Sequence, residues 1–132
     1  MTGKRILLVE DNAANMTLAT FLLQSAGYEV ISATDAETAV GLARTQSPAL
    51  ILMDIQLPGI DGLQATAQLR ADVSTRNIPV IALTALAMKG DEARILAAGC
   101  DGYIAKPLDY KAFLATVGDY LAKASNGSTS HD

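Results

Sequence analysis

The sequence predicts an α/β fold, in which a doubly wound, five-stranded parallel sheet carries helices on both faces. Five short apolar runs alternate with five segments of helical character along the 132 residues. Because the connections are short, each strand returns through a right-handed crossover, which makes the sheet parallel. The runs 6–9, 50–53 and 80–83 are apolar throughout and suit central strands, whereas 29–33 alternates and suits an edge. These features favour the strand order 2-1-3-4-5.

The expected elements form five strand–helix units in a single domain. The strands are expected at residues 5–9, 29–33, 50–53, 80–83 and 102–105. The helices are expected at residues 12–26, 34–46 and 61–71, before Gly99, and from 109 to about 124. Residues 1–124 then make up the domain, and the small, polar residues 125–132 should form a flexible tail or a linker.

Local signals set the bounds of the first three units. Gly27 is a usual residue after a helix end and stops the first helix. Thr34, followed three residues later by Glu37, is a capping-box pattern that starts the second helix. Pro48 ends that helix, and the loop 57–59 separates the third strand from the third helix.

The last two units are bounded by similar signals. Pro79 opens the fourth strand, and a looser stretch, 85–90, precedes the helix that ends before Gly99. Gly102 opens the fifth strand, and Asp109 is expected to cap the last helix.

Composition limits the class of protein. Half of the residues are apolar and 18% are charged, which is ordinary for a soluble globular domain. The net charge of −4 argues against a nucleic-acid surface, which would need a basic patch. Cys100 is the single cysteine, so a reducing cytoplasm and a buried structural thiol are expected. No signal-peptide layout precedes the first strand, and no apolar run approaches membrane-spanning length.

Polar side chains follow four of the predicted strands at the points where the strands end. Glu10 and Asp11 follow the first strand, Asp54 the third, Thr84 the fourth and Lys106 the fifth. In an open α/β sheet these ends share one edge, which is where such folds bind ligands. Three carboxylates, a hydroxyl and an ammonium group are therefore expected to meet in one site.

The carboxylates predict a divalent metal. Glu10, Asp11 and Asp54 repel one another, and such repulsion raises at least one pKa. A hard cation relieves this repulsion, and carboxylates with a loop carbonyl and waters suit the octahedral coordination of Mg²⁺. We expect the backbone carbonyl of Gln56 to be the loop ligand.

The same groups suit phosphoryl transfer to Asp54. Ending a buried strand in a charge costs desolvation energy, so a purely structural role explains Asp54 poorly. A cation would neutralise an incoming phosphoryl group and align it with an Asp54 oxygen. Lys106 and Thr84 would then bind phosphoryl oxygens, and an aspartyl phosphate is a known type of covalent intermediate.

Several short motifs occur together in a fixed order. They are Val9-Glu10-Asp11-Asn12, Leu52-Met53-Asp54-Ile55-Gln56-Leu57-Pro58, Asp61-Gly62, Leu83-Thr84-Ala85 and Lys106-Pro107. Through these motifs the chain resembles the receiver domains of two-component response regulators over residues 4–124. Residues 53–57 and 87–92 look particularly like single-domain cell-division response regulators of the DivK type. The resemblance implies the flavodoxin-like (βα)5 receiver fold.

The resemblance also implies a role for each site residue. The residue that matches Asp54 accepts phosphate from a histidine kinase or a histidine phosphotransfer protein. Those that match Glu10 and Asp11 hold Mg²⁺, and those that match Thr84 and Lys106 bind the phosphoryl group. The chain would then act in phosphorelay signal transduction and not as a turnover enzyme.

An output mechanism follows from the same resemblance. Tyr103 matches an aromatic residue that turns inward on activation when Thr84 is drawn toward the phosphate. The expected signalling face comprises the fourth helix, the fifth strand and the fifth helix, and its downstream protein target is unknown. Tyr103 could equally be a static, half-buried strand residue.

The first helix has a wider apolar surface than a sheet can cover. Its expected core stripe is Asn15, Ala19, Leu22, Leu23 and Ala26. A second stripe, Ala14, Leu18 and Phe21, lies beside it. Either the helix is deeply buried, or Ala14 and Leu18 form a docking patch for a partner helix beside the site.

Other classes of protein fit these residues less well. A flavodoxin-like cofactor binder would not place Glu10 and Asp11 next to a phosphate. A nucleotide hydrolase needs a Gly-rich Lys-Ser/Thr loop, and an aspartyl-phosphate phosphatase needs an Asp where this chain has Gln56. A receiver that is never phosphorylated remains an alternative, as do a stand-alone regulator and the N-terminal part of a longer protein. Asp11 and Asn12 could also simply cap the first helix.

Overall fold

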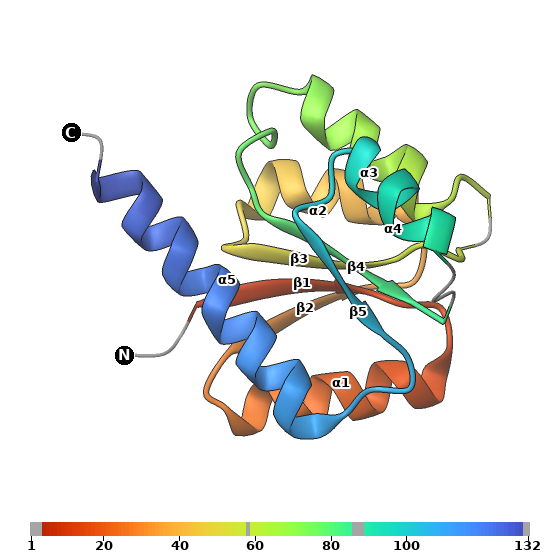
Figure 1. The fold of residues 1–132 in the computed structure, drawn as a ribbon, viewed down its shortest axis with the longest axis vertical. Helices are drawn as coiled ribbons and strands as arrows, with labels where there is room; N and C mark the ends of the chain where they lie inside the picture. Colours follow the sequence, from red (N-terminus) through yellow and green to blue (C-terminus); the bar gives the residue numbers. More distant parts are fainter. Residues whose placement is uncertain (1–3, 58, 86–88, 131–132) are drawn as a thin grey trace.

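The computed structural model describes residues 4–57, 59–85 and 89–130 and contains a five-stranded, all-parallel sheet. The strands are β1 (Arg5–Val9), β2 (Glu29–Ala33), β3 (Leu50–Asp54), β4 (Val80–Thr84) and β5 (Gly102–Ala105). They lie in the order β2-β1-β3-β4-β5, which confirms the predicted fold class (Figure 1). β3 and β4 each run one residue further than expected and so include Asp54 and Thr84.

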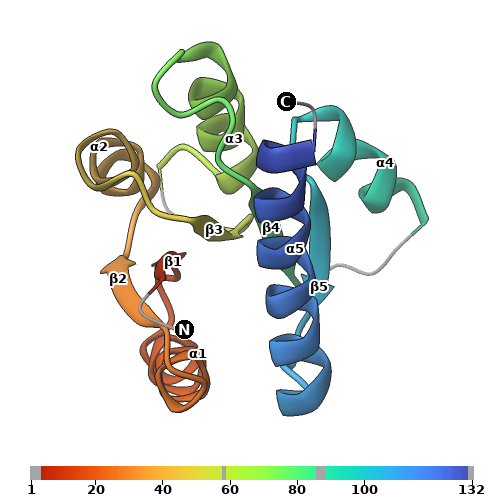
Figure 2. The same ribbon diagram turned by 90° about the vertical axis from the view of Figure 1, so that its left-hand side faces the viewer.

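Helices cover both faces of this sheet. They are α1 (Ala13–Ser25), α2 (Ala36–Gln46), α3 (Gly62–Ala71), α4 (Lys89–Ala97) and α5 (Tyr110–Ser130). α1 and α5 pack on one face, and α2, α3 and α4 on the other (Figure 2). Within the described residues, no helix combines the length and the apolar character needed to cross a bilayer.

The strands supply two apolar cores because successive side chains point to opposite faces. On β1, Ile6 and Leu8 face α1 and α5, where Phe113 is the largest buried side chain. Leu7 and Val9 face α2 and α3. These four side chains are fully buried, which explains the continuous apolar run in the sequence.

Three helix boundaries differ by two or more residues from those expected. The cap of α2 is Asp35 and not Thr34, because the Asp35 carboxylate accepts the Thr38 N–H at 2.8 Å from an extended backbone. α4 begins at Lys89, inside the stretch 85–90 that we expected to be irregular, and residues 86–88 lie outside the described part. α5 continues past 124 to Ser130, so the backbone of 125–130 is helical. No proline interrupts this segment, and polar composition does not by itself end a helix.

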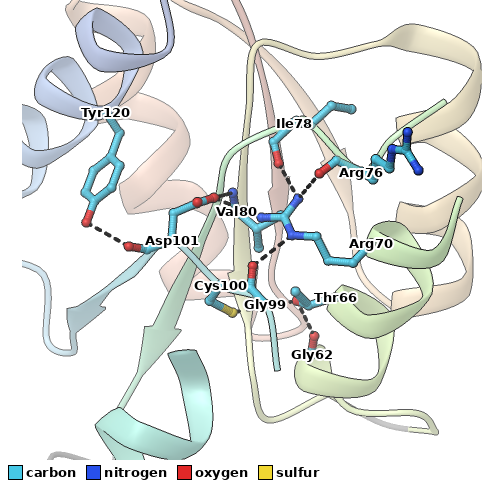
Figure 3. Close-up of polar contacts among 10 residues, drawn as sticks. All are labelled: Gly62, Thr66, Arg70, Arg76, Ile78, Val80, Gly99, Cys100, Asp101 and Tyr120. Carbon is cyan, nitrogen blue, oxygen red and sulfur yellow. Dashed lines mark hydrogen bonds and ion pairs between the residues drawn. The ribbon is translucent and has the colours of Figure 1, made fainter. Parts of the chain in front are cut away.

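Hydrogen bonds and an ion pair of Arg70 hold together the segments at the amino ends of β4 and β5. Arg70, on α3, donates to the carbonyl oxygens of Gly99 and Ile78 at 2.8 Å each and pairs with Asp101 at 2.9 Å (Figure 3). Asp101 also accepts the Val80 N–H, and its carbonyl accepts the Tyr120 hydroxyl at 3.1 Å. Arg70 and Asp101 therefore link α3, β4, the turn before β5, and α5.

Candidate functional site

Three carboxylates meet at the carboxyl ends of β1 and β3. These strands are neighbours, with Val9 opposite Met53, so the residues that follow them lie side by side. Glu10, Asp11 and Asp54 each place one oxygen within 4.8 Å of the others. Glu10 and Asp54 are only 2% exposed, whereas Asp11 faces solvent. The structure thus brings together the cluster expected from the sequence.

Lys106 joins the two buried carboxylates. Its Nζ lies 2.9 Å from Glu10 Oε1 and 3.1 Å from Asp54 Oδ2, and its side chain is 15% exposed. The Lys106 backbone N–H donates to Thr84 O at 2.8 Å, which anchors the residue to the end of β4. The peptide bond between Lys106 and Pro107 is cis. One cation thus lies between two buried anions.

This arrangement shifts two pKa values. Burial raises the pKa of Glu10, and the nearby charge of Asp54 adds to the rise, while Lys106 opposes it. Burial alone would lower the pKa of Lys106, but its contacts with Glu10 and Asp54 outweigh this and raise its pKa above the ordinary value. The ammonium group therefore stays charged at neutral pH.

The Asp54 carboxylate is oriented from both sides. Oδ1 accepts the backbone N–H of Gln56 at 2.9 Å, and Oδ2 accepts from Lys106. Glu10 is held similarly, because its Oε2 accepts the Asn12 N–H at 3.2 Å. Gln56 thus contacts the site through its backbone N–H, and the expected role of its carbonyl as a metal ligand stays a prediction.

Asn12 caps α1, whereas Asp11 does not. The Asn12 side chain accepts the Asn15 N–H at 2.9 Å and is the N-cap. Helix capping therefore accounts for Asn12 but not for Asp11, whose carboxylate belongs to the acidic cluster.

Thr84 and Tyr103 lie on the strands beside this cluster. Thr84 is fully buried at the end of β4, where Leu83 pairs with Asp54 and Thr84 pairs with Ala105. Its position lies between the strand ends that carry Asp54 and Lys106. Tyr103, on β5, is 39% exposed. The roles assigned to both residues remain predictions.

One side of α1 is an exposed apolar patch. Ala19, Leu22 and Leu23 of the expected core stripe are buried, whereas Asn15 and Ala26 are only partly buried. Leu18 is 43% exposed and Phe21 65% exposed, so α1 is not deeply buried. We call the apolar hollow on this side the α1 patch; it is lined by Ala13, Ala14, Thr17, Leu18 and Phe21.

Comparison with known proteins identifies the chain's relatives. The family model for the response regulator receiver domain matches residues 6–118. A polar-differentiation response regulator DivK from Brucella ovis is 49% identical over 121 residues, which cover 92% of this chain and 98% of the relative. A DivK protein from Brucella abortus matches equally well.

Solved structures agree with this assignment. The receiver domain of a sensor histidine kinase from Pseudomonas aeruginosa has a TM-score of 0.85 and 41% identity, covering 91% of this chain and 98% of that one. That structure is described with a magnesium ion coordinated in its active site cleft. A CheY-like receiver domain protein from Methanospirillum hungatei has a TM-score of 0.87 and 27% identity, covering 95% and 98%.

Proposed function

The chain belongs to the response regulator receiver domain family, and on this premise we propose that Asp54 accepts a phosphoryl group from a histidine kinase or histidine phosphotransfer protein. The observation that carries the proposal is the buried Asp54 carboxylate, which lies within 4.8 Å of two other carboxylates and 3.1 Å from an ammonium group. Such a costly arrangement of buried charges is typical of a functional site.

The donor set fits Mg²⁺. Glu10, Asp11 and Asp54 supply carboxylate oxygens, and the loop carbonyl of Gln56 would complete the protein ligands. When bound, the ion would neutralise charge on the incoming phosphoryl group and on the acidic cluster. The magnesium-bearing receiver from P. aeruginosa supports this choice of metal.

The chemical step replaces a P–N bond by a P–O bond. An Asp54 oxygen attacks the phosphorus of the phosphohistidine, the bond to the imidazole nitrogen breaks, and the imidazole leaves with the electron pair. The Gln56 N–H holds Asp54 Oδ1 and Lys106 holds Oδ2, so the carboxylate is positioned before the donor arrives. Lys106 would then pair with a phosphoryl oxygen, and the Thr84 hydroxyl would donate to another.

Phosphate at Asp54 changes the protein only if it binds one conformation better than another. Thr84 moving toward the phosphate would make room for Tyr103 to turn inward. The surface that changes would be α4, β5 and α5, which would then bind or release a downstream protein. The chain would thus help to form and hydrolyse its own aspartyl phosphate without turning over a separate substrate.

The α1 patch is where we propose that the phosphodonor docks. Ala14 and Leu18 lie one to two helical turns beyond Asp11, so a helix carrying the donor histidine could cover the patch and reach Asp54. The observation behind this proposal is the exposure of two apolar side chains of the patch, Leu18 at 43% and Phe21 at 65%.

Phosphoryl uptake tests the proposed function directly. The chain is incubated with Mg²⁺ and acetyl phosphate, and intact mass and a Phos-tag gel are used to detect one acid-labile phosphoryl group. Asp54→Asn should abolish uptake, EDTA should prevent it, and Asp11→Asn should slow it. Uptake that persists in Asp54→Asn or in EDTA contradicts the mechanism, and no uptake by the wild type favours a scaffold that is never phosphorylated.

A further inference from the structure

The first turn of α3 lies directly against the end of the strand that carries Asp54. Gly62 is the first residue of α3 and is buried. Its N–H donates to Ile55 O at 3.3 Å, so the loop that leaves β3 closes back on itself between Ile55 and Gly62. This loop contains Gln56, whose N–H orients the Asp54 carboxylate.

Position 62 has no room for a side chain. A Cβ atom there would lie 2.3 Å from Asp54 O, 2.8 Å from Ile55 Cα and 2.9 Å from Met53 Cγ. The first two of these atoms belong to the backbone and cannot rotate away. A glycine at the start of a helix gives up helix stability relative to alanine, so a close approach of this kind is a physical reason for its presence.

Other glycines in the chain are different. Gly41, in α2, has nothing within 4 Å of the equivalent position. At Gly102 a Cβ would meet the hydroxyl and ring atoms of Tyr120, at the end of a side chain that can move. Of these glycines, Gly62 alone would push against backbone, and that backbone belongs to the phosphoacceptor.

Hydrogen bonds within the first turn of α3 keep that turn rigid. Asp61 and Gln64 form a reciprocal capping box, with both bonds at 2.9 Å. The buried Thr66 hydroxyl donates to Gly62 O at 2.8 Å, as Figure 3 shows. The turn therefore keeps its shape, and a side chain at position 62 would force the turn and the end of β3 apart.

We propose that Gly62 is a positioning residue for phosphoryl transfer, an inference that rests on the proposed function of Asp54. Its lack of a side chain lets α3 brace the backbone of Asp54 and of the following loop. Relieving a 2.3 Å contact needs a movement of about 1 Å, and a misplacement of about 1 Å is enough to slow a reaction by ~100-fold.

The test compares two buried glycines. Gly62→Ala should slow phosphoryl uptake from acetyl phosphate with Mg²⁺ by at least ~10-fold per folded molecule, whereas Gly102→Ala should stay within about twofold of the wild type. Folded fraction is measured for each protein by circular dichroism. In metal-free protein, the amide resonance of Gln56 should shift in Gly62→Ala and not in Gly102→Ala, because that N–H is bonded to Asp54.

A second pair of variants removes side-chain atoms and adds none. This pair tests the inference even if Gly62→Ala does not fold. Asp61→Ala removes the cap of α3, and Asp35→Ala removes a similar cap from α2, which follows the edge strand β2 and not the strand that carries Asp54. Asp61→Ala should slow uptake roughly threefold and Asp35→Ala should not, although both lose similar stability.

The outcomes separate this inference from the proposed function. A wild-type protein that takes up no phosphate overturns the role of Asp54. A wild type that is phosphorylated, with a folded Gly62→Ala that keeps its rate and its Gln56 resonance, overturns only the positioning role. Equal effects of Asp61→Ala and Asp35→Ala also count against it.

Discussion

Lys106 Nζ lies 3.1 Å from Asp54 Oδ2, although Lys106 follows β5 and Asp54 ends β3, and these strands are not neighbours in the sheet. The lysine reaches across the end of β4, where Thr84 is buried. Lys106 therefore links the ends of β3, β4 and β5. Its ammonium group is the cation that the described structure places between the buried carboxylates of Glu10 and Asp54.

Removal of this cation should destabilise the metal-free protein. Lys106→Met leaves Glu10 and Asp54 facing each other without compensation, and we expect a loss of about 1–3 kcal/mol in the free energy of unfolding. The value is below that for a fully buried pair because the site opens to solvent at Asp11. Urea unfolding in EDTA measures it, with the exposed Lys111→Met as the control. Equal urea midpoints for both variants would contradict the argument.

The strands and the site could be predicted because each rests on a local pattern. A run such as Ile6–Val9 is apolar because both faces of the sheet are covered, and such runs are readable without any tertiary information. Once the strands are placed, Asp54 and Lys106 must share an edge. The parallel topology therefore carries most of the prediction of the site.

The features that were missed depend on geometry that sequence patterns do not encode. Thr34 and Asp35 are both good capping residues, and only the backbone angles decide that Asp35 caps α2. Nothing in the sequence distinguishes Arg70 from other helical arginines. Its contacts with Gly99 and Asp101 depend on where the turn before β5 lies in the fold. Gly62 belongs to a motif in the sequence, but only the three-dimensional structure shows that a Cβ atom there would collide with Asp54 O.

Leu18→Glu should block phosphotransfer selectively. We expect the rate from the cognate histidine protein to fall at least ~10-fold, about 1.4 kcal/mol, while uptake from acetyl phosphate is unchanged. Leu18 is 43% exposed, so the charge should not disturb the core. Val73→Glu is the matched control, since Val73 is 73% exposed and lies after α3, outside the α1 patch. Equal losses with both donors would mean that Leu18 supports the fold and not docking.

The thiol of Cys100 should be inert in the native protein. Cys100 is 5% exposed, and burial raises the pKa of its thiol above the usual value, while its Sγ lies 3.8 Å from Thr66 Oγ1. Since the thiolate is the reactive form, we expect alkylation by iodoacetamide to be at least ~100-fold slower than in urea. Ser25→Cys in a Cys100→Ala background, an exposed position, should react at the rate of an unfolded thiol. Fast alkylation of native Cys100 would contradict the packing described.

Asp72 should contribute to stability in a pH-dependent way. Hydrogen bonds from the Ser74 N–H and hydroxyl, and then the contact with Arg44, lower the pKa of Asp72 to about 2 from 3.8. Because the folded pKa is the lower one, this contribution is present above pH 3.8 and is lost as the pH falls toward 2. The urea midpoints of wild type and Asp72→Asn should therefore differ at neutral pH and converge in acid. Arg44→Met should keep most of the pH dependence, since the Ser74 bonds are the larger cause.

Phosphorylation should alter the face formed by α4, β5 and α5. Thr84 is fully buried and Tyr103 is 39% exposed, so a phosphate that draws the Thr84 hydroxyl inward would leave space into which Tyr103 can turn. Hydrogen exchange of the phosphorylated wild type, compared with Asp54→Asn under the same conditions, should change within residues 84–120 and stay constant in α2. Thr84→Ala should still take up phosphate from acetyl phosphate but lose most of this change, because the group that senses the phosphate is gone. Identical exchange throughout 84–120 in the phosphorylated wild type and in Asp54→Asn would show that phosphate does not act through Thr84 and Tyr103.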